Sequence, residues 1–154
     1  MSHLSLKVAV RYVVAQDEVL EEAHEILEGA LEEIDDCIEK LGAFLDYARP
    51  AQELLQIRDL EKPLGTLTQY HRILGLITRD LKKLEREKDL SRILREFHDD
   101  ADTLGAWLNS DFPSAEDLVY EYFWDSPKGR RLADQVTMVE DYVNGMRTFY
   151  LEHR

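Results

Sequence analysis

The sequence predicts an all-α protein: a four-helix-type bundle with one or two additional short helices, built as a single domain over residues 1–154. Two observations carry this prediction. Apolar residues recur at helical spacing in four long segments, and the connections between these segments are short. With 154 residues, of which 44% are hydrophobic, the chain is long enough to bury a core of its own.

The N-terminal segment, residues 4–14, carries an ambiguous pattern. Its apolar residues alternate as they would in a strand and are of types that favour β-structure (Leu4, Leu6, Val8, Val10, Tyr12 and Val14). No other segment shows a strand pattern, so a strand here would have to pair with a second copy of the chain. We therefore favour a helix and keep strand exchange within a dimer as the alternative.

The first long helix is expected from Val19 to Ala48. Its apolar residues repeat every seven positions in three rows and form a stripe wide enough for a bundle core: Leu20, Leu27, Ile34 and Leu41; Ala23, Ala30, Cys37 and Phe44; Leu31, Ile38 and Leu45. Pro50 is expected to end this helix, because the residue before a proline disfavours helical geometry. Val19 and Ile26 widen the apolar face, which predicts burial by the N-terminal segment or by a second subunit.

The middle of the chain predicts two more long helices. A short amphipathic piece over residues 51–60, closed by Pro63 and Gly65, comes before them. Their stripes are Leu67, Tyr70, Leu74, Ile77, Leu81 and Leu84, and then Leu90, Leu94, Phe97, Ala101, Leu104 and Leu108. The two registers do not join smoothly, so we expect a turn near Lys88 and Asp89.

The last long helix is expected from about Pro127 to Tyr150. Ser126 suits the N-cap and Pro127 suits the first helical position. The core stripe of this helix consists of Leu132, Val136, Val139, Val143, Met146 and Tyr150. Before it, Ser114 and Asp117 resemble a capping box and predict one short helix.

Charge and composition limit the classes of function. The net charge is −13, and the segment 17–39 holds eleven acidic residues and no Lys or Arg. This acidity argues against nucleic acid as a ligand, because phosphates are bound by clustered Lys and Arg; a basic partner protein, or the chain's own basic segment 79–95, is the expected counterpart. No apolar run reaches the ~18 residues of a membrane span. The single cysteine, Cys37, excludes an internal disulfide, and together these features favour the cytoplasm.

Histidines offer two chemical alternatives. Because an up-down bundle would bring them to a similar height, His24, Glu28, His98 and Asp102 could form a two-histidine, two-carboxylate metal site. Alternatively, His98 followed directly by Asp99 has the form of a histidine phosphoacceptor, with Asp99 orienting the imidazole. Against both, the histidines fall one residue past core positions, and apolar residues are expected to fill the interior. We therefore expect no buried carboxylate pair and no bound cofactor.

Aromatic residues gather in one acidic stretch and predict a partner-binding surface: Trp107, Phe112, Tyr120, Tyr122, Phe123 and Trp124. The three consecutive aromatics at its end cannot all face inward from one helix, since neighbouring residues are ~100° apart. Trp and Tyr are enriched in interfaces, but the alternative is that these side chains cap the open end of the bundle. Taken together, the sequence predicts a non-catalytic, homodimeric interaction protein of regulatory or adaptor type, with His98-centred chemistry as the alternative.

Overall fold

Every regular element that the structure describes is helical. The computed structural model describes residues 3–109, 123 and 126–154. Its elements are α1 (His3–Leu55), the 3-10 turn η1 (Arg58–Leu60), α2 (Glu61–Lys82), α3 (Leu90–Asn109) and α5 (Pro127–His153). The predicted all-α class is confirmed. Residues 4–14 belong to α1, and no strand occurs in the described ranges, so strand exchange was the wrong alternative.

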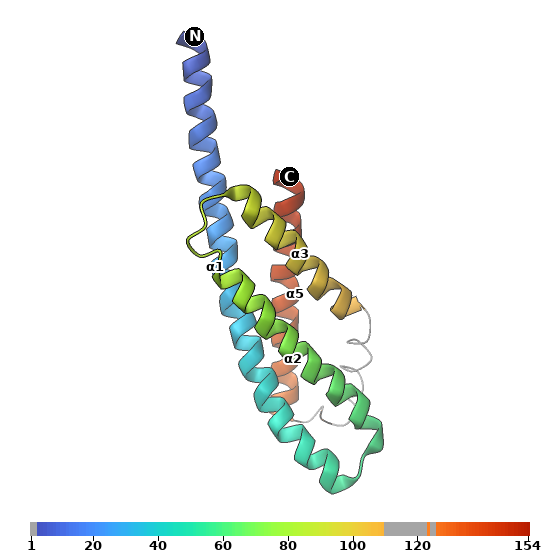
Figure 1. Cartoon of the computed structure of the whole chain (residues 1–154). Helices are drawn as coiled ribbons and strands as arrows, with labels where there is room; N and C mark the ends of the chain where they lie inside the picture. Colours follow the sequence, from blue (N-terminus) through green and yellow to red (C-terminus); the bar gives the residue numbers. More distant parts are fainter. Residues whose placement is uncertain (1–2, 110–122, 124–125) are drawn as a thin grey trace.

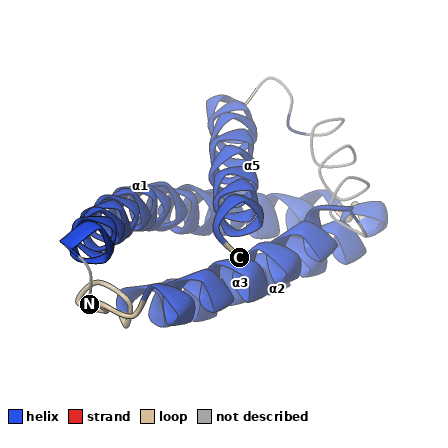
Figure 2. Ribbon diagram, turned by 90° about the horizontal axis from the view of Figure 1, so that it is seen from above, coloured by secondary structure: helices blue, strands red, loops and turns tan. Residues whose placement is uncertain are grey.

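The four long helices alternate in direction. In Figure 1, α1 descends, α2 rises, α3 descends again and α5 returns upward, with the C-terminus well short of the N-terminal tip of α1. Helix α1 packs against both α2 and α5, while α3 packs chiefly against α5 and touches α2 only sparsely. Figure 2, seen from above, places α5 beside α1, with α2 and α3 forming the opposite side. This is the up-down bundle that short connections predict.

The core follows the predicted stripes closely. The three rows on α1 are buried apart from Leu20 and Ile38, which are partly buried and pack against the same cluster. In α5 the buried residue of the last turns is Phe149 rather than the expected Tyr150, which is only partly buried. Ile93 of α3, absent from the predicted stripe, is fully buried. Aromatic rings close the core, with Phe97 edge-on to Phe149 at 6.0 Å between centroids.

Helix α1 does not end at Pro50. The proline lies inside the helix, which continues to Leu55. Termination comes from Gln56, whose φ of 55° is left-handed and whose N–H donates to the Glu53 carbonyl. The next N–H, of Ile57, reaches back to the Gln52 carbonyl at 3.1 Å. These two bonds form a Schellman motif, which satisfies the last carbonyls of the helix. The predicted boundary was wrong because α1 continues through Pro50 despite the cost of a proline inside a helix, and the Schellman motif at Gln56 ends it instead.

The connections agree with the prediction in part. Residues 83–89 form the expected turn between α2 and α3. The separate amphipathic piece over residues 51–60 is absent as a unit, since its first half completes α1 and its end forms η1. Pro63 and Gly65 lie within the first two turns of α2 instead of ahead of it. Proline is tolerated there because the first N–H groups of a helix have no intrahelical partner. The predicted short helix at Ser114 and Asp117 lies outside the described residues.

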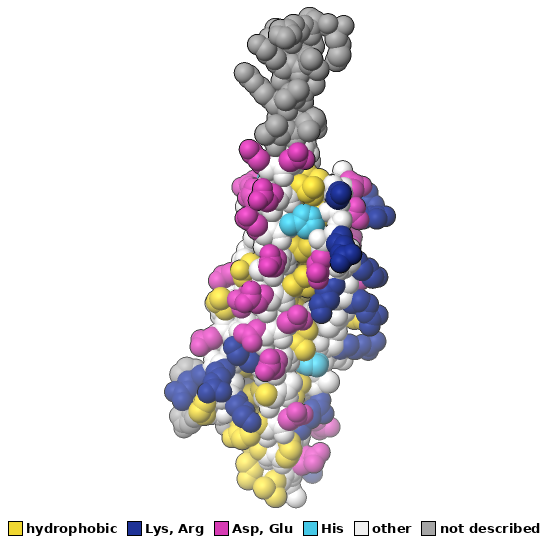
Figure 3. Space-filling model, turned by 90° about the vertical axis from the view of Figure 1, so that its left-hand side faces the viewer, with side chains coloured by type: hydrophobic (Ala, Val, Ile, Leu, Met, Phe, Trp, Pro, Cys, Tyr) yellow, Lys and Arg dark blue, Asp and Glu magenta, His cyan; other side chains and the backbone are white. Residues whose placement is uncertain are grey.

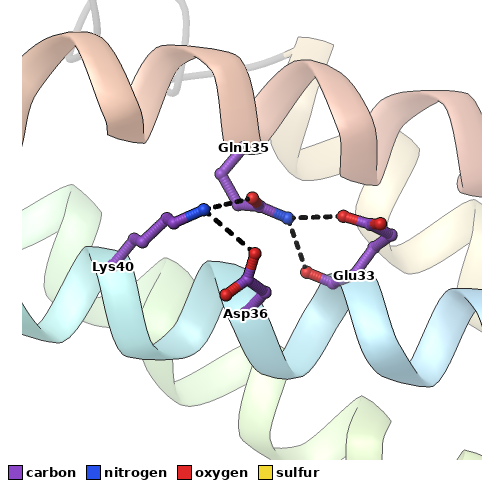
Figure 4. A network of polar contacts seen from close by, with 4 residues as sticks. All are labelled: Glu33, Asp36, Lys40 and Gln135. Carbon is purple, nitrogen blue, oxygen red and sulfur yellow. Dashed lines mark hydrogen bonds and ion pairs between the residues drawn. The ribbon is translucent and has the colours of Figure 1, made fainter.

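A polar network fixes α5 against α1. Gln135 is 4% exposed, and its amide nitrogen donates to both the backbone carbonyl and the carboxylate of Glu33, at 3.0 and 2.8 Å. Its amide oxygen accepts from Lys40 at 3.0 Å, and Lys40 also pairs with Asp36 (Figure 4). Because a buried amide left without partners is costly, this arrangement favours one register of the two helices.

The first turns of α1 leave the bundle. We call residues 3–16 the N-terminal arm: in Figure 1 the helix runs on beyond both the α2–α3 turn and the C-terminal end of α5. Fourteen helical residues span about 21 Å. Core burial begins only further along, with Val19 and Leu20 partly buried and Ala23 fully buried. None of the helices in the described ranges is sufficiently long and apolar to traverse a bilayer.

Candidate functional site

His98 lies at the surface of α3. Its side chain is 42% exposed, and its two ring nitrogens are each 3.4 Å from a carboxylate oxygen, Nδ1 from Asp99 and Nε2 from Asp102. The ring also packs against Tyr150 of α5, with 4.5 Å between centroids. The predicted neighbours Asp99 and Asp102 are thus both close to this histidine. The imidazole is positioned by two exposed acids and one ring, at the edge of a shallow groove of about 300 Å³.

His24 is used elsewhere. Its Nε2 donates to the backbone carbonyl of Glu87 at 2.7 Å, which ties α1 to the turn between α2 and α3. A nitrogen that donates to a carbonyl is protonated, so only Nδ1 could act as a metal ligand in this arrangement. Glu28 is exposed and borders the same groove as His24. The structure therefore places His24 and Glu28 beside the α2–α3 turn, whereas His98 packs against Tyr150 with Asp102 next to it.

The predicted aromatic surface falls mostly outside the described residues, which omit Phe112, Tyr120, Tyr122 and Trp124. Trp107 is partly buried near the end of α3. Phe123 is 7% exposed and meets two rings of α1 edge-on, Phe44 at 5.6 Å and Tyr47 at 5.7 Å between centroids. Phe123 thus takes the alternative role, closing one end of the core.

A groove runs along α1 below the arm. Its volume is about 660 Å³, and three leucines of α1 (Leu20, Leu27 and Leu31) lie among its lining residues. Glu28 and Asp35 lie on the α1 side. The side of the α2–α3 turn is mixed, with three basic and two acidic residues: Lys82, Arg86, Lys88, Glu85 and Glu87. Figure 3 shows this face: an apolar strip with acidic side chains along one border and basic side chains along the other. Such a strip suits an apolar helix flanked by charge.

One polar cluster breaks the apolar interior. Asp80 of α2 and Glu96 and Asp100 of α3 bring carboxylate oxygens within 4.8 Å of one another, the single group of three or more potential metal ligands in the described part of the chain. Asp100 is only 5% exposed, and its Oδ2 atom has no hydrogen-bond partner. Asp100 is thus a buried acid that the sequence analysis did not predict, whereas Asp80 and Glu96 are only partly buried.

The electrostatics of this cluster follow from crowding and burial. Burial, reinforced by the carboxylates of Glu96 and Asp80, raises the pKa of Asp100 to about 8. Burial also raises the pKa of Glu96, with Asp80 and Asp99 adding to the effect. At neutral pH and without a cation, the cluster is thus expected to hold a proton, shared between the two residues of α3.

The sequence carried a signal for Asp100 that the stripe analysis missed. Ile93, Phe97, Asp100 and Leu104 follow a 4–3–4 spacing, which is that of inward-facing positions on a bundle helix. The predicted stripe used Leu94 and Ala101 instead, so Asp100 was expected to lie beside the core and not in it. An acidic residue at an inward position is uncommon enough to mark a functional candidate. No sequence pattern predicted that Asp80 belongs to this cluster, because its distance from Glu96 and Asp100 depends on how α2 packs against α3.

The lone thiol belongs to the core. Cys37 is fully buried in α1, and burial, with a contribution from Asp36, raises its pKa to about 12. A thiol in that state is a poor nucleophile and a poor metal ligand, so it acts as a small apolar side chain.

Comparison with known proteins gave no match to this chain, whether against family models, curated proteins or solved structures.

Proposed function

We propose that this protein is a non-catalytic interaction protein of regulatory or adaptor type that works as a homodimer joined through its N-terminal arm. The observation that carries the proposal is the arm itself. Nine of the fourteen residues 3–16 are apolar, two are basic and none is acidic, yet the helix that they form lies beyond the bundle. A helix with so little polar surface is normally buried against another chain.

The geometry of α1 favours a second copy as the occupant. The sequence indicated that Val19 and Ile26 would be covered either by the N-terminal segment or by another subunit. Residues 3–16 continue α1 without a break, so they cannot fold back onto later residues of the same helix. Val19 and Ile26 are already partly buried against the core of their own bundle, so a second copy would cover the part of their surface that stays exposed.

The arm and the groove suit each other. An isologous antiparallel pair of α1 helices centred near Val19 would place Val10 of one copy level with Leu27 of the other. The arm's only charged side chains, Lys7 and Arg11, would then lie along the acidic segment 17–39 of the second copy. Each arm would cover an apolar groove, and each basic pair would offset part of the acidic charge. The remaining acidic face of α1 would stay available to a basic partner protein.

Sedimentation velocity over a range of protein concentrations tests the proposal. The wild type is expected to form dimers, and the double variant Val10→Asp, Val13→Asp is expected to be monomeric, because two charges would enter an apolar interface. Leu54→Asp is the matched control, since Leu54 is 84% exposed at the opposite end of α1. Circular dichroism checks that both variants keep the bundle. A wild type that stays monomeric throughout, or a double variant that dimerises like the control, would contradict the proposal.

A further inference from the structure

The cluster of Asp80, Glu96 and Asp100 offers donors from two helices. The ligand atoms converge to within 4.8 Å of one another, which is a separation that one ion can bridge. Asp100 anchors the cluster on the buried side of α3, whereas Asp80 and Glu96 are partly exposed and leave a route from solvent. The arrangement is thus neither sealed in the core nor spread over an open surface.

The hydrogen bonds and charges of this cluster are not fully balanced by the rest of the protein. The Oδ2 atom of Asp100 is buried and accepts no hydrogen bond from a described N–H group or hydroxyl, although buried polar atoms in native proteins almost always have a partner. Only a proton shared with Glu96 provides a hydrogen bond to the Asp100 carboxyl. No Lys or Arg in the described ranges forms an ion pair with any of the three carboxylates. Lys83 offsets a small part of the charge on Glu96 without an ion-pair contact, while Asp99 adds a further negative charge. Three acids therefore face one another, and no described Lys or Arg balances them through an ion-pair contact.

We propose that Asp80, Glu96 and Asp100 bind one divalent cation that prefers oxygen ligands, such as Mg²⁺, Ca²⁺ or Mn²⁺, and that the ion clamps α2 to α3. An all-carboxylate donor set selects hard cations over zinc or copper, which favour nitrogen and sulfur. Three protein ligands leave further coordination positions for water, which the half-exposed side of the site can supply.

The position explains what the ion would do for the fold. Helices α2 and α3 are joined by the turn 83–89 but otherwise touch only sparsely, so little apolar packing holds them together. An ion held by Asp80 on one helix and by Glu96 and Asp100 on the other would supply the missing contact. It would also remove the repulsion among the three carboxylates and satisfy the buried oxygen. The site is distinct from His24 and His98, the residues with which the sequence suggested metal binding.

Titration calorimetry on chelator-treated protein at pH 8 provides the test, with MgCl₂, CaCl₂ and MnCl₂ as separate probes. We expect saturable binding of one ion per chain for at least one of the three, and a higher melting temperature when that ion is present. Asp100→Asn and Glu96→Gln should each weaken binding by about ten-fold or more. Asp99→Asn is the matched control, because it removes one exposed carboxylate next to the site and should leave binding within about two-fold.

The variants separate a site from general acidity. Failure of the wild type to bind any of the three ions would overturn the proposal. Equal weakening by Asp99→Asn and Asp100→Asn would overturn it too, since that result would indicate a diffuse attraction to the acidic surface. Should Asp100→Asn unfold, Glu96→Gln still decides the matter, because Glu96 is only partly buried and its amide replacement keeps the shape of the side chain.

Discussion

The buried carboxyl of Asp100 makes the stability of the metal-free protein depend on pH. The folded chain holds a proton on this group up to a pKa of about 8, while the unfolded chain releases it near the ordinary value of 3.8. Between these values the folded state binds more protons than the unfolded state, so stability falls as the pH rises. Below pH ~4 the group contributes no such penalty, and above pH ~8 the penalty is complete.

The magnitude follows from the same two values. Each pH unit in that window lowers the free energy of unfolding by about 1.4 kcal/mol, which sums to ~4 kcal/mol between pH 5 and pH 8. Asp100→Asn copies the shape of the protonated acid and cannot ionise. The variant should therefore match the wild type only below pH ~4, and between pH 5 and pH 8 its stability should gain ~4 kcal/mol on that of the wild type. Glu96, whose pKa burial also raises, changes wild-type stability in the same direction.

Urea unfolding followed by circular dichroism, in a chelating buffer at pH 5, 6, 7 and 8, measures this difference. Asp99→Asn serves as the control for removing one negative charge, since Asp99 is exposed. Its stability should fall with pH nearly as steeply as that of the wild type, because Asp99 raises the pKa of Asp100 less than burial, Glu96 and Asp80 do. If Asp100→Asn also runs parallel to the wild type over the whole range, Asp100 does not bury its charge on folding, and the reasoning fails.

Three further predictions concern α1, α2 and the core. In the same urea titration, Gly29→Ala should destabilise the fold by about 1–3 kcal/mol, because the new Cβ would lie 2.6 Å from the Tyr142 ring. Gly75→Ala should instead stabilise the fold by about 0.5–1 kcal/mol, because no atom lies within 4 Å of the new Cβ and alanine favours the helix. Gln56→Gly should raise the melting temperature by a few degrees, since glycine adopts the left-handed φ of 55° without strain. The Cys37 thiol should stay inert to a chromogenic disulfide reagent at pH 8 until denaturant is added, and prompt labelling of the native protein would contradict its burial.

The sequence was sufficient to predict those elements whose structure follows from apolar periodicity. The heptad of α1 specified which residues face the core, because a 3.6-residue turn puts positions seven apart on one side of a helix. The N-terminal arm shows the limit of that reasoning. Its β-favouring residues alternate as in a strand, yet the segment extends a helix that is already nucleated, and propagation is far easier than nucleation.

Other features depended on contacts that no local pattern encodes. Helix α1 ends at Gln56, and glutamine is not a residue type that predicts a left-handed conformation. Pro50, in contrast, predicted a helix break that does not occur. The carboxylate cluster needs Asp80 from a neighbouring helix, so its existence depends on tertiary packing. Gln135 reads as an ordinary polar residue on α5, and only the approach of Glu33 shows why it can be buried.

We expect the proposed dimer and the proposed cation site to be coupled. The last residue of α2 and the turn after it supply one border of the groove, from Lys82 to Lys88, and Asp80 lies three residues before that turn. An ion that clamps α2 to α3 would therefore hold the groove's basic border in place. If the bound ion raises the association constant of the dimer by some factor, dimerisation must raise the affinity for the ion by the same factor. Sedimentation with and without the bound ion should show tighter association of the wild type when the ion is present, and no such change in Glu96→Gln. Dimerisation that is equally strong in both conditions would show that the turn has the same structure with and without the ion.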